Sequence, residues 1–85
     1  MPWALAITKS AARDLGRLSQ QDLRRINSAF EAMRADPYGG DVKWLRGSER
    51  TLRRRVGSWR ILFEAHQEAR SVAILGVKRR TSTTY

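Results

Sequence analysis

The stretch RTLRRRVGSWRILFEA, from Arg50 to Ala65, carries charged side chains in a segment whose pattern predicts a β-sheet. It contains five arginines, yet the branched and aromatic residues between them favour strands. The dipeptide Gly57–Ser58 is typical of a turn, so we expect strands over Thr51–Val56 and Trp59–Ala65. The stretch therefore predicts an antiparallel hairpin with arginines along it.

Successive side chains in a strand point to opposite faces of the sheet. In the first strand of the hairpin, Arg53 and Arg55 therefore share one face. The opposite face carries Leu52, Arg54 and Val56. We expect Arg53 and Arg55 to lie on the open face of the sheet.

The second strand of the hairpin shows the same alternation. If Ile61 and Phe63 face the core, Arg60 projects from the open side, and a matching register brings it near the arginines of the first strand. A third strand over Val72–Val77 is followed by three basic residues, Lys78, Arg79 and Arg80. These residues predict a basic patch on the open face that is suited to phosphate groups.

The first half of the chain predicts a strand and two helices. Residues 3–7 alternate in hydrophobicity, and Thr8 is the expected N-cap of a short helix. Ser19 followed by Asp22 resembles the capping box of a longer helix, which ends before Pro37 because a residue that precedes proline disfavours the helical conformation. We treat residues 42–47 as a link to the hairpin.

This order of elements predicts an α+β fold in a single domain over residues 1–85. We expect an antiparallel-rich four-stranded sheet with the two N-terminal helices packed on one face, in the order β-α-α-β-β-β. Each helix has one apolar stripe to bury, which favours packing of both on the same face of the sheet.

Charge is concentrated in the second half of the chain. Residues 1–42 hold six Lys and Arg against five Asp and Glu, whereas residues 43–85 hold eleven against three. Clustered positive charge favours a polyanion or an acidic protein as partner. The alternative is a basic face that serves only solubility, but the concentration in one half argues against it.

Composition excludes several other classes of protein. The 85 residues include no cysteine, so disulfide bonds and thiolate metal sites are absent. No apolar run reaches the length of a membrane span, and the first residues lack the features of a signal peptide. We expect a cytoplasmic protein with no metal or other cofactor and no membrane partner. The one histidine, His66, falls in a predicted turn, where a surface role is expected.

Three segments in this order resemble one family. They are DPYGGDVKWLRG at residues 36–47, RRRVGSWRILFE at residues 53–64 and VKRRTSTTY at residues 77–85. With the order of helices and strands, they resemble the RelE/ParE superfamily of bacterial toxins from toxin–antitoxin systems, and within it the RelE-like mRNA interferases. The resemblance covers nearly the whole chain.

The resemblance implies a ribosome-dependent endoribonuclease. Such a toxin cleaves translated mRNA in the ribosomal A site without a metal, by attack of a ribose 2′-hydroxyl on the adjacent phosphate. The positions that match the family's catalytic residues are Arg53, Arg55, Arg60, Arg79 and Tyr85. Further basic residues are expected to bind the RNA backbone, namely Lys43, Arg46, Arg54, Lys78 and Arg80. The implied partners are mRNA, the ribosome and an acidic RelB-like antitoxin.

The chain departs from the family at the expected base. RelE carries lysines where this chain has Arg53 and Arg55, and an arginine is a poor general base although it clamps anions well. The candidates that remain for the base are Glu49, Lys78 and Tyr85 with its terminal carboxylate. Two other functions also stay open: a ParE-like inhibitor of DNA gyrase, and a basic nucleic-acid-binding module without catalysis.

Overall fold

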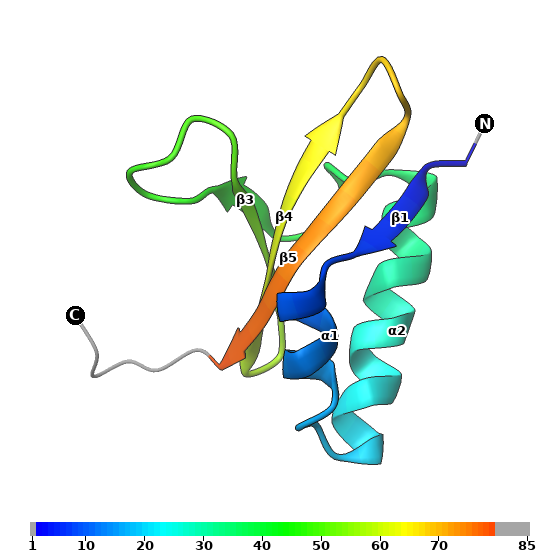
Figure 1. The fold of residues 1–85 in the computed structure, drawn as a ribbon, viewed down its shortest axis with the longest axis vertical. Helices are drawn as coiled ribbons and strands as arrows, with labels where there is room; N and C mark the ends of the chain where they lie inside the picture. The colour runs from blue at the N-terminus through cyan, green and yellow to red at the C-terminus, as the bar shows by residue number, and fades with distance from the viewer. Residues whose placement is uncertain (1, 80–85) are drawn as a thin grey trace.

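Two helices cover one face of a five-stranded sheet in the computed structural model, which describes residues 2–79 (Figure 1). Its elements in chain order are β1 (Ala4–Ile7), α1 (Lys9–Leu15), α2 (Gln20–Ala35), β2 (Val42–Trp44), β3 (Leu52–Val56), β4 (Trp59–His66) and β5 (Ser71–Arg79). The strands lie side by side in the order β1-β5-β4-β3-β2. The predicted α+β class, with both helices on one face, is confirmed.

The sheet has one strand more than the sequence predicted. Strand β2 arises in the segment 42–47, which we expected to be only a link, and Lys43 pairs with Arg53 in an antiparallel register. Three residues are too short to show alternation, so the pattern missed this strand. The sheet is also mixed, because β1 pairs in parallel with β5 while the other neighbouring strands are antiparallel.

Both helices begin at the predicted caps. Thr8 Oγ1 accepts a hydrogen bond of 3.1 Å from the Ala11 N–H at the start of α1, and Ser19 Oγ accepts one of 3.2 Å from the Asp22 N–H at the start of α2. Helix α1 ends at Leu15, and Gly16 is its C-cap. No helix among residues 2–79 combines the length and apolar composition needed to cross a membrane.

The core lies between the helices and the sheet. Ile26 and Met33 of α2 are fully buried, as are Ile61 and Phe63 of β4. Ile61 and Phe63 point toward the helices. Arg60 directly precedes Ile61 in the strand, so it points away from the helices, as predicted.

Strand β5 contains a bulge that interrupts its alternation. Leu62 pairs with Gly76, whereas Phe63 pairs with Ile74, so Leu75 is the extra residue on β5. Ile74 and Val77 are therefore both buried although they lie three residues apart. The side chains after the bulge face opposite sides from those that simple alternation predicts.

Candidate nucleic-acid interface

Basic side chains form two rows on the face that the helices leave uncovered. Cross-strand pairing brings Lys43 of β2 next to Arg53 of β3. The second row consists of Arg55 of β3, Arg60 of β4 and Lys78 of β5, because Arg60 pairs with both neighbours. We call these five residues the open-face cluster, and it brings together two of the predicted RNA-binding residues with three of the predicted catalytic ones.

Two members of the cluster already have acidic partners. Arg53 Nη1 lies 3.3 Å from Asp41 Oδ1 and donates to the Asp41 carbonyl oxygen at 3.3 Å, and only 12% of the Arg53 side chain is exposed. Lys78 Nζ lies 3.1 Å from Asp14 Oδ2. By contrast, the guanidinium groups of Arg55 and Arg60 have no hydrogen-bond or ion-pair partner among residues 2–79.

Asp14 is the one buried charged residue in the described part of the chain. Its Oδ2 accepts a hydrogen bond of 2.9 Å from the Val77 N–H, which lies on the part of β5 that β1 does not cover. The same carboxylate forms an ion pair with Lys78. Burial by itself raises the pKa of Asp14, but the Val77 hydrogen bond and the Lys78 ammonium together bring this pKa below its ordinary value of 3.8. Asp14 thus holds the end of β5, and with it Lys78, against α1.

Arg54 does not join the open-face cluster, although we expected it to bind RNA. It pairs with Ile61 and points toward the helix side, where its Nη1 donates a hydrogen bond of 2.6 Å to the Gly39 carbonyl oxygen. The strand places alternate residues on opposite faces, so Arg54 cannot share the face of Arg53 and Arg55. Its role in this structure is to fix the loop between α2 and β2.

Arg79 is also separated from Arg60. Because of the bulge at Leu75, Arg79 pairs with Trp59 on the helix side, and its guanidinium carbon lies 4.7 Å from the centre of the indole ring. A pocket of about 200 Å³ opens there, and its lining includes Arg79, Trp59 and Leu18. The expectation that Arg79 projects from the open face with Lys78 is wrong for this structure.

The remaining predicted residues lie at the margins. Arg46 is exposed on the connection between β2 and β3. Arg80 and Tyr85 lie outside the described residues. Within residues 2–79 no group of three or more His, Cys, Asp or Glu side chains is placed to hold a metal ion.

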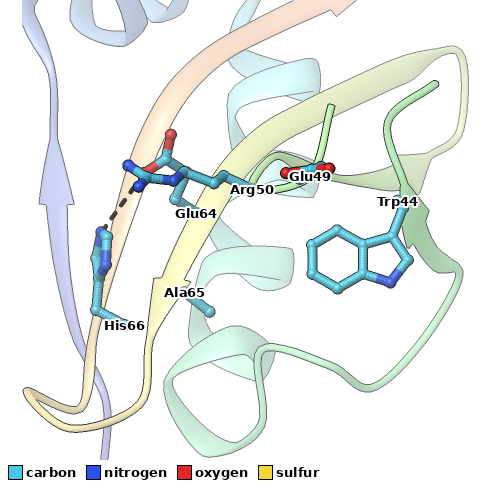
Figure 2. Close-up of a pocket in the computed structure, with 6 residues that line it drawn as sticks. All are labelled: Trp44, Glu49, Arg50, Glu64, Ala65 and His66. Carbon is cyan, nitrogen blue, oxygen red and sulfur yellow. Dashed lines mark ion pairs between the residues drawn. The ribbon is translucent and has the colours of Figure 1, made fainter. Parts of the chain in front are cut away.

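The structure also shows a pocket that the sequence did not suggest. It has a volume of about 380 Å³ and is lined by Trp44, Glu49, Arg50, Glu64, Ala65 and His66 (Figure 2). We refer to it as the Trp44 pocket. Glu49 was a candidate base, and we expected His66 to lie on the surface. The sequence carries little signal for this pocket, because the predicted strands Thr51–Val56 and Trp59–Ala65 are nearly equal in length, whereas the observed strands have five and eight residues and leave part of the β4 edge uncovered.

Comparison with known proteins identifies the family. A chain of the toxin–antitoxin complex RelBE2 from Mycobacterium tuberculosis is 31% identical to this chain and matches it with a TM-score of 0.82, over 94% of this chain and 100% of the other. The chain belongs to the RelE toxin family. RelE1 of Methanocaldococcus jannaschii is a second RelE relative, 26% identical over 83 residues, which cover 94% of this chain and 92% of RelE1.

More distant RelE structures share the fold. The archaeal RelE–RelB complex from Pyrococcus horikoshii has a TM-score of 0.84 at 23% identity, over 98% of this chain and 100% of the matched chain. The isolated RelE toxin of E. coli has a TM-score of 0.80 at 13% identity, over 96% of this chain and 88% of the other. No protein-family model matches the sequence.

Proposed function

We propose that this RelE-family chain is the toxin of a toxin–antitoxin pair and that it cleaves translated mRNA in the ribosomal A site. The observation that carries this proposal is the Arg55–Arg60 pair on the open face, where two guanidinium groups have no acidic partner within residues 2–79. Unpaired guanidinium groups bind phosphate oxygens in bidentate fashion. Such a toxin acts in the cytoplasm, where the ribosomes are.

The proposed reaction needs no metal. The ribose 2′-oxygen forms a bond to the adjacent phosphorus and the bond from phosphorus to the 5′-oxygen breaks, which leaves a 2′,3′-cyclic phosphate and a 5′-hydroxyl. The 2′-hydroxyl gives up a proton to a base, and the leaving 5′-oxygen takes one up. Negative charge grows on the phosphate oxygens in the transition state, and Arg55 and Arg60 supply fixed positive charge for it.

The other proposed catalytic residues have different parts in this scheme. Arg53 is already paired with Asp41, so it contributes to the field of the site more than it binds phosphate directly. Arg79 reaches the same phosphate only if it leaves Trp59. We propose Tyr85 as the residue that stacks on or orients the reacting nucleotide. Among the candidate bases, Lys78 is disfavoured because its ion pair with Asp14 depends on its positive charge.

We also propose an acidic antitoxin as partner. The chain carries a net charge of +9, and the RelE relatives include solved complexes of RelE with RelB. Large apolar side chains are exposed at Trp44, Tyr38 and Ile7, which gives an antitoxin segment apolar surface to cover. A disordered acidic segment that folds on binding suits a surface of this charge.

Expression of the chain in cells tests the activity directly. We expect cuts within reading frames, mapped by the 5′ ends of the fragments, and no cuts when the start codon of the same message is removed. Intact mRNA together with inhibited DNA supercoiling would instead identify a gyrase inhibitor. Intact mRNA with RNA binding alone would identify a module without catalysis.

A further inference from the structure

The Trp44 pocket lies where two neighbouring strands differ in length. Strand β3 begins at Leu52 opposite Phe63, whereas β4 continues to His66. Beyond Phe63, β4 pairs with β5 alone, so its other edge is not covered by a strand. The connection between β2 and β3 contributes Glu49 and Arg50 beside this edge. The pocket is therefore a product of the fold rather than of a single flexible loop.

One wall of the pocket is the solvent-exposed indole ring of Trp44. Trp44 is 61% exposed and has no ring or cation contact among the described residues, whereas Trp3 is buried and Trp59 lies under Arg79. Figure 2 shows the indole on one side of the pocket, with Glu64 and His66 on the other. An exposed aromatic ring is a platform on which a single-stranded base stacks.

The charged walls disfavour phosphate as the group that enters, because the two carboxylates of the lining outnumber its one guanidinium, that of Arg50. Glu49 and Glu64 line the pocket, and Glu64 Oε1 lies 3.7 Å from His66 Nε2. Carboxylates repel phosphate and accept hydrogen bonds. The ligand of this pocket must therefore combine a flat ring with N–H donors. Guanine has this combination, because its Watson–Crick edge presents the N1–H and the 2-amino group side by side.

One wall of the pocket is also aligned with the proposed phosphate site, whereas Trp44 belongs to the other face at the edge of the sheet, because it pairs with Leu52. Glu64 follows Arg60 by four residues on β4 and points to the same open face, a separation of about 13 Å along the strand. From this alignment we infer that the Trp44 pocket binds a guanine base of the single-stranded RNA whose phosphate lies at Arg55 and Arg60. The identity of the ligand as RNA rests on the proposed function.

Binding of short RNA tests this inference without any cleavage. The probes are labelled 2′-O-methyl pentauridines, which cannot be cut, with one guanosine moved through each position. We expect the best guanosine oligonucleotide to bind the full chain about 5- to 100-fold more tightly than the same oligonucleotide with adenosine, measured by fluorescence anisotropy. Inosine, which lacks the 2-amino group, should fall between the two. The indole N–H signal of Trp44 should shift in the NMR spectrum on binding of the guanosine probe.

Substitutions in the pocket test which side chains produce the preference for guanosine. Trp44→Ala should weaken binding of the guanosine probe about 5-fold or more, whereas Trp44→Phe keeps a stacking surface and should retain most of the binding. Glu49→Gln/Glu64→Gln should lose the preference for guanosine over adenosine while it keeps the affinity for plain pentauridine. Tyr38→Ala is the matched control, because Tyr38 is also an exposed aromatic residue but does not line the pocket.

The inference is wrong if guanosine and adenosine probes bind equally, if no probe binds, or if Trp44→Ala and Tyr38→Ala behave alike. It is also wrong if only an antitoxin peptide moves the Trp44 signal. A preference for guanosine in a chain that leaves translated mRNA intact would overturn the proposed activity and keep the pocket. Cleavage of translated mRNA without this preference would support the proposed activity and overturn the inference about the pocket.

Discussion

Arg55 and Arg60 lie opposite each other across the β3–β4 hairpin, on the face of the sheet that the helices leave open. Their basic neighbours Arg53 and Lys78 are neutralised by Asp41 and Asp14, respectively. Apart from the ammonium group of Lys43 in the other row, the positive charge of the open-face cluster that is available to a phosphate is therefore that of this pair.

Arg55→Ala and Arg60→Ala should each reduce cleavage of translated mRNA by about 100- to 1,000-fold, the loss typical of removing one preorganised donor from a transition state. Neither change should unfold the protein, because both side chains lie on the open face. Primer extension on a translated message measures the loss. Arg24→Ala, on the exposed side of α2, serves as the control and should cleave normally. Full activity in a folded Arg55→Ala/Arg60→Ala variant would remove the pair from the mechanism.

Arg79→Ala should reduce cleavage less than Arg60→Ala does. Arg79 lies over Trp59 on the helix side, so it must give up this contact before it can reach RNA on the open face. The same variant should change the fluorescence of Trp59, which reports the loss of the stacked guanidinium. Equal losses of cleavage in the two variants would mean that Arg79 turns toward the RNA in the complex.

Arg55→Ala should lower the salt dependence of RNA binding more than Arg53→Ala does. Each phosphate contact with a single strand contributes about 0.7 to the slope of log affinity against log salt concentration. Arg55 should show a change of this size, whereas Arg53 is already paired with Asp41 and should show little. Titrations of a single-stranded RNA at several salt concentrations measure both slopes. The opposite ranking would show that the Asp41 pair opens on binding.

Replacement of Asp14 should change both stability and its pH dependence. Because the pKa of Asp14 is lower in the folded chain than its ordinary value of 3.8, the ionised carboxylate contributes stability above that pH. This contribution is lost as the pH falls below 3.8 through the folded pKa. Asp14→Ala should lower the free energy of unfolding at pH 7 by about 1–3 kcal/mol. Urea unfolding should show a smaller fall in stability between pH 7 and pH 3 for Asp14→Asn than for the wild type; an equal fall would assign the acid sensitivity to other groups.

Alanine substitutions at Gly40 and Gly47 distinguish the cost of backbone strain from the cost of a steric clash. Both have positive φ, of 84° and 83°, which non-glycine residues adopt at a free-energy cost of about 1–2 kcal/mol. A Cβ at Gly40 would lie 2.8 Å from Arg54 Nη2, whereas a Cβ at Gly47 would meet nothing within 4 Å. Gly40→Ala should therefore destabilise more than Gly47→Ala, because the Arg54 guanidinium must leave the Gly39 carbonyl oxygen. Equal thermal shifts in the two variants would mean that Arg54 moves without loss.

The sequence by itself determined the features that depend on short-range pattern. Alternation along residues 50–65 assigned Arg53, Arg55 and Arg60 to one face, because the side-chain period of a strand is a local property. The caps at Thr8 and Ser19 also follow from neighbouring residues, since each hydroxyl bonds a backbone N–H only three residues away. The same pattern placed Arg54 on the helix side, which the structure confirms and which conflicts with its predicted role in RNA binding.

Only the tertiary structure decided the features that depend on neighbouring strands. The bulge at Leu75 turns Arg79 toward Trp59, and the local sequence offers only the isolated glycine Gly76 as a sign of it. Asp14 reaches Val77 and Lys78 from more than 60 positions away in the chain, a pairing that requires α1 to pack beside the end of β5. The Trp44 pocket exists because β4 extends past β3. Sequence periodicity fixes which way a side chain points within one regular strand, whereas strand length, bulges and contacts between distant elements follow from how the whole sheet and its helices pack.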